Sequence, residues 1–337
     1  MPPFETTRRS WLTGAATCAL TPPAHARARA FDSDDALKAV LQRAVAAQAV
    51  PWAGLLVARD GEDLFVHMEG APRDHVDVLR SATKIATVTC LMTLVQAKAL
   101  KLEDPVARFI PAFAGEKAGI TLRHLLSMSS GLPPVYRGFN DSQPLAEAAQ
   151  VIAGAPLAAK PGEVFIYGNL GLTVAGRIAE IAAGESWDAY FARAVAAPLG
   201  MTFEYGPLET GRLGGGGRTS LESYGRLLKL HLAGGRHGGK RILDYSLVKA
   251  MQSPSGARFR NPVPQTTAYG YGMGWWFDQV GTAGRPMIIS DPGAWGAYPW
   301  IDLRRRYAAF LFVRKRLDDG VALQRTLRPL IEAGLDR

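Results

Sequence analysis

A serine and a lysine three positions apart are the residues of this 337-residue chain that first suggest chemistry. They lie in the segment LRSATK at 79–84. If Ser81 opens a helix, Lys84 lies one turn later on the same face, where the two side chains can meet. A neutral lysine can accept the proton of a serine hydroxyl that attacks a carbonyl, provided that its surroundings lower its pKa from about 10.4. The spacing therefore predicts a serine nucleophile with a lysine base.

The Ser-x-x-Lys spacing does not identify a site alone, because it recurs at Ser246 and Lys249. Ser81 taken alone could equally be a helix cap. A second segment, FIYGN at 165–169, favours Ser81 because it holds the single Tyr-x-Asn of the chain and follows a Pro-Gly turn. Tyr167 facing the lysine could pass the serine proton to a leaving group, while the amide of Asn169 could orient lysine and substrate.

A third segment, SDPGAWG at 290–296, continues a predicted strand and contains two glycines. Gly293 would let a substrate approach the strand edge closely, because glycine has no side chain to block it. The backbone amides of Ala294 and Ser81 could then form an oxyanion hole for the negative charge that develops during attack on a carbonyl. We predict that Asp291, Gly293 and Ala294 take part in substrate binding.

The elements that must position these residues change in character along the chain. A helix is expected at 35–50, a β-hairpin from 53–59 and 63–69, and mostly helices and loops from 82 to 221. Further strands are expected at 271–277, 287–290, 296–302 and 307–313, before a last helix at 321–335. Strands at both ends predict an α/β (α+β) protein with one antiparallel sheet built from both termini, flanked by helices, and an inserted helical lobe.

The predicted lobe boundaries follow from this pattern. The α/β lobe comprises about 31–80 and 225–337, and the helical lobe about 81–224. The glycine run from Gly214 to Gly217 is interpreted as a flexible connector, because no Gly-Lys-Ser/Thr follows it as in a phosphate loop.

The first thirty residues suggest an export signal. An arginine pair, Arg8 and Arg9, precedes an uncharged run at 10–24, and small residues at 24–30 offer cleavage sites. This segment resembles a twin-arginine signal peptide, which predicts a periplasmic or secreted mature chain from about residue 31 onward. A basic tail and a lipid-anchored Cys18 are the alternatives. No later segment reaches the ~18 apolar residues of a membrane span, so no integral membrane segment is expected in the mature chain.

Composition argues against several other classes of function. The net charge of +9 comes from 39 basic and 30 acidic residues that are scattered, so nucleic acid is not an expected partner. Cys18 and Cys90 have no metal-ligand spacing, and we expect no metal and no cofactor. His124 and His231 are interpreted as structural. The expected partner is a small-molecule ester or amide, bound by a monomer.

The three segments together resemble the serine β-lactamase and penicillin-binding-protein superfamily, in its class C β-lactamase-like branch of esterases, D-amino-acid peptidases and amide hydrolases. The resemblance extends over LEDPVARF at 102–109, ITLRHLLSMSSGL at 120–132, APLGMT at 197–202 and YGMGWW at 271–276. It implies a β-lactamase-like fold, with the site between a terminal α/β lobe and a helical lobe. By position it implies that Ser81 is acylated, Lys84 is the base, Tyr167 the acid/base partner and Asn169 a positioning residue.

The third segment departs from the family pattern. Where the family usually has Lys-Thr-Gly or His-x-Gly, this chain has Asp291-Pro292-Gly293. An aspartate would repel the carboxylate of β-lactams and D-alanyl peptides, which the usual cation helps to bind. We therefore expect an exported serine hydrolase for an ester or amide without such a carboxylate. The alternative is an impaired binding or sensor protein with the same fold.

Overall fold

The computed structural model describes residues 33–139, 143–206 and 211–336. The predicted export signal at 1–30 lies outside these residues. Within them, no helix combines the length and apolar character needed to cross a bilayer.

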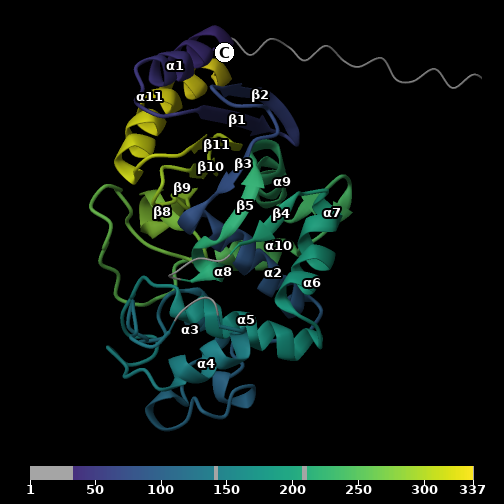
Figure 1. Ribbon diagram of the computed structural model, residues 1–337, viewed down its shortest axis with the longest axis vertical. Helices are drawn as coiled ribbons and strands as arrows, with labels where there is room; N and C mark the ends of the chain where they lie inside the picture. Colours follow the sequence, from purple (N-terminus) through teal and green to yellow (C-terminus); the bar gives the residue numbers. More distant parts are fainter. Residues whose placement is uncertain (1–32, 140–142, 207–210, 337) are drawn as a thin grey trace, which may run out of the picture.

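Six antiparallel strands from both ends of the chain form the central sheet (Figure 1). Their order is β2-β1-β11-β10-β9-β8, so the N-terminal hairpin pairs directly with the last strand of the chain. The predicted α/β class and the predicted sheet from both termini are confirmed. The strands are β1 (Ala53–Arg59), β2 (Glu62–Glu69), β8 (Trp276–Val280), β9 (Pro286–Ser290), β10 (Tyr298–Asp302) and β11 (Tyr307–Val313).

Both faces of the sheet are buried, which explains why its central strands are almost wholly apolar. Alternate residues of β1 and β11 point to opposite faces. Leu55 and Leu311 pack with α1 (Asp34–Ala46) and α11 (Leu317–Leu335), which lie side by side on one face (Figure 1). Leu56 and Phe310 belong to the other face, which α9 (Leu221–Leu232) covers. Burying each such side chain contributes roughly 1.5–3 kcal/mol.

The helical lobe is built around α2 (Lys84–Gln96), a helix that is buried on nearly all sides. Its sequence is apolar around the whole circumference, as in a helix enclosed by other elements. The surrounding helices are α3 (Leu122–Leu126), α4 (Leu145–Ala153), α5 (Leu170–Ala183), α6 (Trp187–Phe191), α7 (Ala197–Leu199) and α10 (Tyr245–Met251).

A second, three-stranded sheet was not predicted. It contains β3 (Val76–Val78), β5 (Gly217–Ser220) and β4 (Phe203–Tyr205), in that order. It joins a strand of the predicted α/β lobe to two strands of the predicted helical lobe. Two-residue strands β6 (Arg236–His237) and β7 (Lys240–Arg241) form a separate hairpin.

Several predicted boundaries were wrong at one end, among them the helix predicted to reach residue 50, which ends at Ala46, and the strand predicted from residue 296, which begins at Tyr298. The helix predicted from residue 321 begins at Leu317, because the side chain of Asp319 caps its first turn by accepting from the Arg316 amide. The strand predicted from residue 271 begins at Trp276, because Gly274 adopts φ +85° in a turn that packs against the start of α2. That backbone conformation favours glycine and interrupts a strand.

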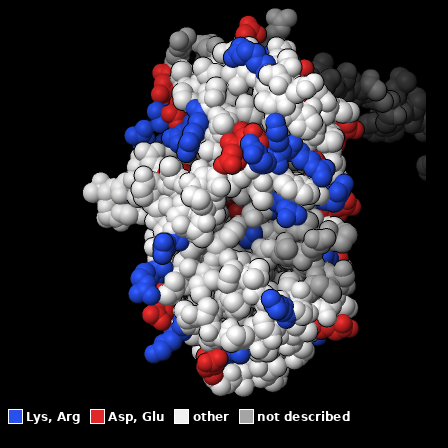
Figure 2. Space-filling model, turned by 60° about the vertical axis from the view of Figure 1, so that its left-hand side comes forward, with Lys and Arg blue, Asp and Glu red and all other residues white. Residues whose placement is uncertain are grey.

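Figure 2 shows basic and acidic side chains interspersed on one face of the molecule. The basic residues counted in the sequence do not form an uninterrupted basic patch on this face. Among the described residues, several basic side chains are paired with acids, for example Arg328 with Glu332 on α11 and Arg316, the residue before α11, with Asp319.

Candidate active site

Ser81 and Lys84 meet at the junction of the two lobes. Ser81 lies in a 3-10 turn, Arg80–Thr83, that leads directly into α2, whose first residue is Lys84. The Lys84 Nζ lies 3.2 Å from the Ser81 Oγ and donates to the carbonyl oxygen of Gly214 at 2.7 Å. Lys84 is fully buried, whereas Ser81 is partly exposed. The serine is therefore accessible and the lysine is enclosed behind it.

The surroundings of Lys84 favour its neutral form. Burial lowers the pKa of Lys84 to about 8, with a smaller lowering from Arg80, while the Asp291 carboxylate acts in the opposite direction. A lysine with this pKa is neutral in about one molecule in ten at pH 7, far more often than an exposed lysine. Lys84 thus has the proton affinity that a general base needs.

Tyr167 lies against Lys84 on the side of the helical lobe. The Lys84 Nζ is 4.8 Å from the centre of the Tyr167 ring. Burial and the Asp291 carboxylate raise the pKa of Tyr167, and hydrogen bonding from Ser81 and Trp276 only partly offsets this effect. Tyr167 is therefore protonated at neutral pH, so it can donate and relay a proton.

The Asn169 side chain packs against Gly211 and Gly214 and does not line the cavity at Ser81. Asn169 precedes α5 as the N-cap residue. A Cβ placed on Gly211 or Gly214 would come within 2.2 Å of the Asn169 side chain. Since the Gly214 carbonyl accepts from Lys84, this arrangement connects Asn169 to the base. It is compatible with the positioning role that the family resemblance implies.

A cavity of about 110 Å³ opens beside the nucleophile. Its lining is mostly apolar and comes from both lobes and from the loop before β8. The lining residues are Ser81, Tyr167, Val263, Thr266, Trp276, Pro292, Ala294 and Leu317. Ala294 and Ser81 border the same space, as the predicted oxyanion hole requires.

Gly293 has a different structural role from the predicted one. A Cβ on Gly293 would lie 2.1 Å from the carbonyl oxygen of Leu79 and 3.5 Å from the Cβ of Arg80. The close approach that glycine permits here is thus to the backbone before Ser81. It allows the segment after β9 to lie against the nucleophile turn, and Gly293 itself does not line the cavity.

Asp291 was predicted to take part in substrate binding, whereas the structure has it behind the nucleophile. Its side chain is fully buried and does not line the cavity. One carboxylate oxygen, Oδ2, accepts from the backbone amide of Ile85 at 3.2 Å. The carboxyl group faces the start of α2, whose backbone amides donate to it, but burial outweighs these donors and raises the pKa of Asp291 well above its usual range. The predicted contact of Asp291 with a substrate carboxylate is therefore wrong, because the side chain does not reach the cavity.

Sequence reasoning missed the residue that holds the base. Gly214 lies in α8 (Arg212–Gly215), and the run Gly214 to Gly217 is buried and hydrogen-bonded, so the prediction of a flexible connector was wrong. The Gly217 amide donates to the Thr83 Oγ1 at 2.9 Å, directly beside the nucleophile turn. The glycines allow this backbone to approach α2 closely. The sequence feature that could have indicated this role is the glycine run itself. Glycine runs also occur in exposed linkers, so the run alone does not distinguish the two cases.

The second Ser-x-x-Lys pair has no comparable surroundings. Ser246 and Lys249 are exposed on α10. The histidines are structural as predicted: His124 Nδ1 accepts from the Thr121 amide in a helix cap, and His231 Nε2 bonds to Thr89 at 2.8 Å. Cys90 is buried in the core.

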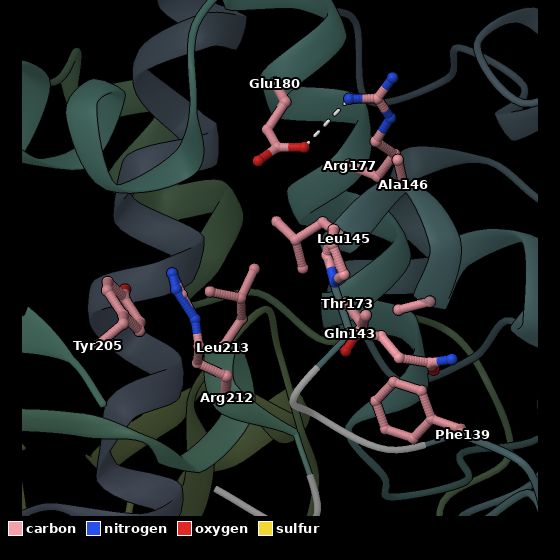
Figure 3. A pocket seen from close by; sticks show the side chains of 12 residues that line it. Phe139, Gln143, Leu145, Ala146, Thr173, Arg177, Glu180, Tyr205, Arg212 and Leu213 are labelled. Carbon is pink, nitrogen blue, oxygen red and sulfur yellow. Dashed lines mark hydrogen bonds and ion pairs between the residues drawn. The ribbon is translucent and has the colours of Figure 1, made fainter. Parts of the chain in front are cut away.

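A larger cavity of about 720 Å³ lies between α4, α5 and α8 (Figure 3). Figure 3 shows Arg212 and Leu213 on one side and Leu145 and Thr173 on the other. Its arginines are paired, Arg177 with Glu180 at 3.1 Å and Arg212 with Asp188 at 2.6 Å. Through α8 this cavity adjoins the Gly214 segment that holds Lys84.

The chain belongs to the Beta-lactamase family, which residues 37–331 match. It is 31% identical to esterase EstB of Burkholderia gladioli over 194 residues, which is 49% of each protein. It is 25% identical to protein flp of Staphylococcus aureus over 189 residues, or 51% of this chain and 38% of flp. The matches thus span less than half the length of these curated relatives.

Solved structures agree with the fold. A protein from Bacteroides dorei DSM 17855 is 30% identical and superposes with a TM-score of 0.81, covering 88% of this chain and 98% of its own. The hydrolase EstCE1 is 19% identical, with a TM-score of 0.73 and coverage of 91% and 99%. The chain is therefore a β-lactamase-fold member of a serine hydrolase family, as the sequence predicted.

Proposed function

We propose that the protein is an exported serine hydrolase that forms an acyl-enzyme on Ser81, with Lys84 as base and Tyr167 as acid/base partner. One observation carries the proposal: the Lys84 Nζ lies 3.2 Å from the Ser81 Oγ, in surroundings that lower the pKa of Lys84 to about 8. A serine hydroxyl within reach of a partly neutral lysine is the arrangement that nucleophilic catalysis requires.

Acylation proceeds by attack of the Ser81 Oγ on the substrate carbonyl while its proton moves to the Lys84 Nζ. The backbone amides of Ser81 and Ala294 stabilise the oxyanion, since both residues border the cavity. Collapse of the tetrahedral intermediate breaks the bond to the leaving group. The leaving group takes the hydroxyl proton of Tyr167, and the proton held by Lys84 restores Tyr167.

Deacylation uses the same groups for water. A water molecule takes the place of the leaving group, gives one proton to the base and attacks the acyl carbonyl. The bond between that carbonyl and the Ser81 Oγ breaks, and Ser81 regains a proton. No metal or redox partner is needed to balance either step.

The cavity favours a short acyl group. Its volume of about 110 Å³ is small beside the roughly 300–1,000 Å³ of typical ligand pockets, so a small acyl group fits it best. Its walls are mostly apolar, including Val263, Trp276 and Leu317. Short-chain esters are the favoured substrates, a choice that the relative named as an esterase also supports. Amides remain the second substrate class.

Covalent labelling tests the proposal directly. A fluorophosphonate probe should label the protein, and Ser81→Ala should abolish both labelling and hydrolysis of p-nitrophenyl acetate. Ser246→Ala is the matched control and should retain both, because Ser246 is exposed on another helix. Labelling of a folded protein on another residue, or none at all, would favour the alternative of a binding or sensor protein.

A further inference from the structure

A tryptophan next to one amide of the predicted oxyanion hole is stacked with an arginine next to the other. Trp295 directly follows Ala294, and Arg80 directly precedes Ser81. The guanidinium carbon of Arg80 lies 4.6 Å from the centre of the Trp295 ring, which is a cation–π contact. The two side chains thus join the two segments that carry the oxyanion-hole amides, and the catalytic steps above give neither side chain a role.

The backbone of Arg80 has a conformation that residues other than glycine rarely adopt. Its φ is +53°, in the left-handed region, and such a conformation persists only where surrounding contacts enforce it. Within its own turn, the Thr83 Oγ1 donates to the Arg80 carbonyl oxygen at 2.7 Å. From the facing loop, the Trp295 ring contacts the Arg80 side chain. Since the Ser81 amide belongs to the same peptide group as the Arg80 carbonyl, the conformation of Arg80 sets the direction of this donor.

The turn from Gly293 to Gly296 carries the second amide. The amide of its last residue donates to the carbonyl oxygen of its first at 2.9 Å, and the Lys315 amide donates to the Trp295 carbonyl oxygen at 2.9 Å. Within the part of the chain that the structure describes, no acceptor is found for the Ala294 amide. Ala294 is exposed and lines the cavity beside the nucleophile. Its amide is therefore available to a substrate oxygen when the turn is correctly placed.

A second arginine holds the Trp295 ring against the two sheets. The guanidinium carbon of Arg314, which directly follows β11, lies 4.5 Å from the ring centre. The same guanidinium donates to the buried carboxylate of Asp77 in β3 at 3.1 Å. Strand β11 belongs to the central sheet and β3 to the three-stranded sheet. The ring is therefore held by regular elements, and it provides a fixed surface on which the Arg80 guanidinium lies.

We propose that Trp295 is a positioning residue for the oxyanion hole: by stacking with Arg80 it sets the distance between the amides of Ser81 and Ala294. This inference rests on the proposed function, because it assigns those amides to the oxyanion hole. Oxyanion donors act on charge that develops in the transition state, so a misplaced donor lowers kcat and kcat/KM by the same factor. Trp295 itself does not line the cavity beside Ser81, so binding of the ground-state substrate does not depend on it.

The experiment measures kcat and kcat/KM for p-nitrophenyl acetate, the inhibition constant of phenylboronic acid, and the thermal midpoint of each variant. The boron of this inhibitor binds the Ser81 Oγ and becomes tetrahedral, like the carbonyl carbon in the transition state. Trp295→Ala should lower both kinetic constants by roughly 10–10²-fold, since a misplacement of about 1 Å can cost 10²-fold and loss of a whole oxyanion donor about 10²–10³-fold. The inhibition constant should rise in parallel. Trp295→Phe keeps a ring under the guanidinium and should recover most of the loss.

Two substitutions of Arg80 separate the stack from the backbone conformation. Arg80→Gly removes the stack and adopts a positive φ without steric cost, whereas Arg80→Ala removes the stack and keeps that cost. Both should lower kcat, and the double variant with Trp295→Ala should lose little more than either single variant, because the two residues act through one contact. Arg193→Ala is the matched control and should keep the wild-type constants, since it removes an arginine that lies 5.1 Å from the Tyr190 ring centre, outside the cavity lining.

Other outcomes overturn the proposal. Wild-type kcat in Trp295→Ala or in Arg80→Gly means that the stack does not set the oxyanion hole. A change confined to KM means that Trp295 contributes to substrate binding instead. Additive losses in the double variant mean that the two residues act independently. Should Trp295→Ala unfold, kcat of the folded Arg80→Gly variant decides the proposal. Absence of wild-type hydrolysis and labelling would instead refute the proposed function, so the two failures are distinguishable.

Discussion

The Lys84 Nζ donates to the carbonyl oxygen of Gly214 at 2.7 Å, across 130 positions of sequence. This bond orients the base from the side opposite to its own helix, while Ser81 lies at 3.2 Å. A lysine has four rotatable side-chain bonds, so one contact to the nucleophile would not hold it. The buried glycine segment supplies the second contact.

The first prediction concerns this segment. Gly214→Ala places a Cβ within 2.2 Å of the Asn169 Oδ1, so the segment or Asn169 must shift. A displacement of about 1 Å at a catalytic group can cost roughly 10²-fold in rate. We expect kcat for p-nitrophenyl acetate to fall by about that factor in a protein that still folds. Gly119→Ala is the control, because a Cβ there has open space; equal activity of both variants would contradict the role of Gly214.

The second prediction concerns the base itself. Lys84→Ala should slow acylation by roughly 10²–10⁴-fold, the usual contribution of a general base. Lys84→Arg should recover little, since arginine stays protonated at all relevant pH values. The measurement is the rate of fluorophosphonate labelling of Ser81, with circular dichroism to verify folding. Labelling at the wild-type rate in either variant would mean that another group accepts the serine proton.

The third prediction concerns the acyl pocket. Val263→Ala should enlarge the cavity beside Ser81 and raise kcat/KM for p-nitrophenyl octanoate relative to acetate by about tenfold, since one methylene in an apolar pocket is worth roughly 1–3 kcal/mol. Val135→Ala is the control, because Val135 is 76% exposed and does not line the cavity. If the ratio of kcat/KM for octanoate to that for acetate is the same in Val263→Ala as in the wild type, the acyl group binds elsewhere.

The fourth prediction concerns export. In a bacterium with a functional twin-arginine pathway, the protein should accumulate outside the cytoplasm with a new N-terminus between about residues 27 and 31. Replacement of Arg8 and Arg9 by lysine should keep the protein in the cytoplasm. Immunoblots of cell fractions measure its location, and N-terminal sequencing measures whether it has been cleaved. Export of the double variant at the wild-type level would point to a different route.

Local sequence patterns were sufficient for the parts of the protein in which neighbours in sequence are neighbours in space. The proximity of Ser81 and Lys84 follows from one helical turn. The hairpin of β1 and β2 follows from two strand-like runs around a short turn. Strand β11 is recognisable as a continuous apolar run, and every residue in it is buried in the structure. These features depend on period and turn residues, which any short window of sequence contains.

The tertiary structure decided what acts on those residues from a distance. Gly214 and Asp291 are 130 and 207 positions from Lys84, and no periodicity indicates that a glycine carbonyl would hold the base or that the Asp291 side chain would accept from the amide of Ile85. The β3-β5-β4 sheet was missed for the same reason, because its short strands are stabilised by pairing with each other rather than by their own composition. The sequence shows which reactive side chains are present. Long-range packing sets where each side chain points and which groups it contacts.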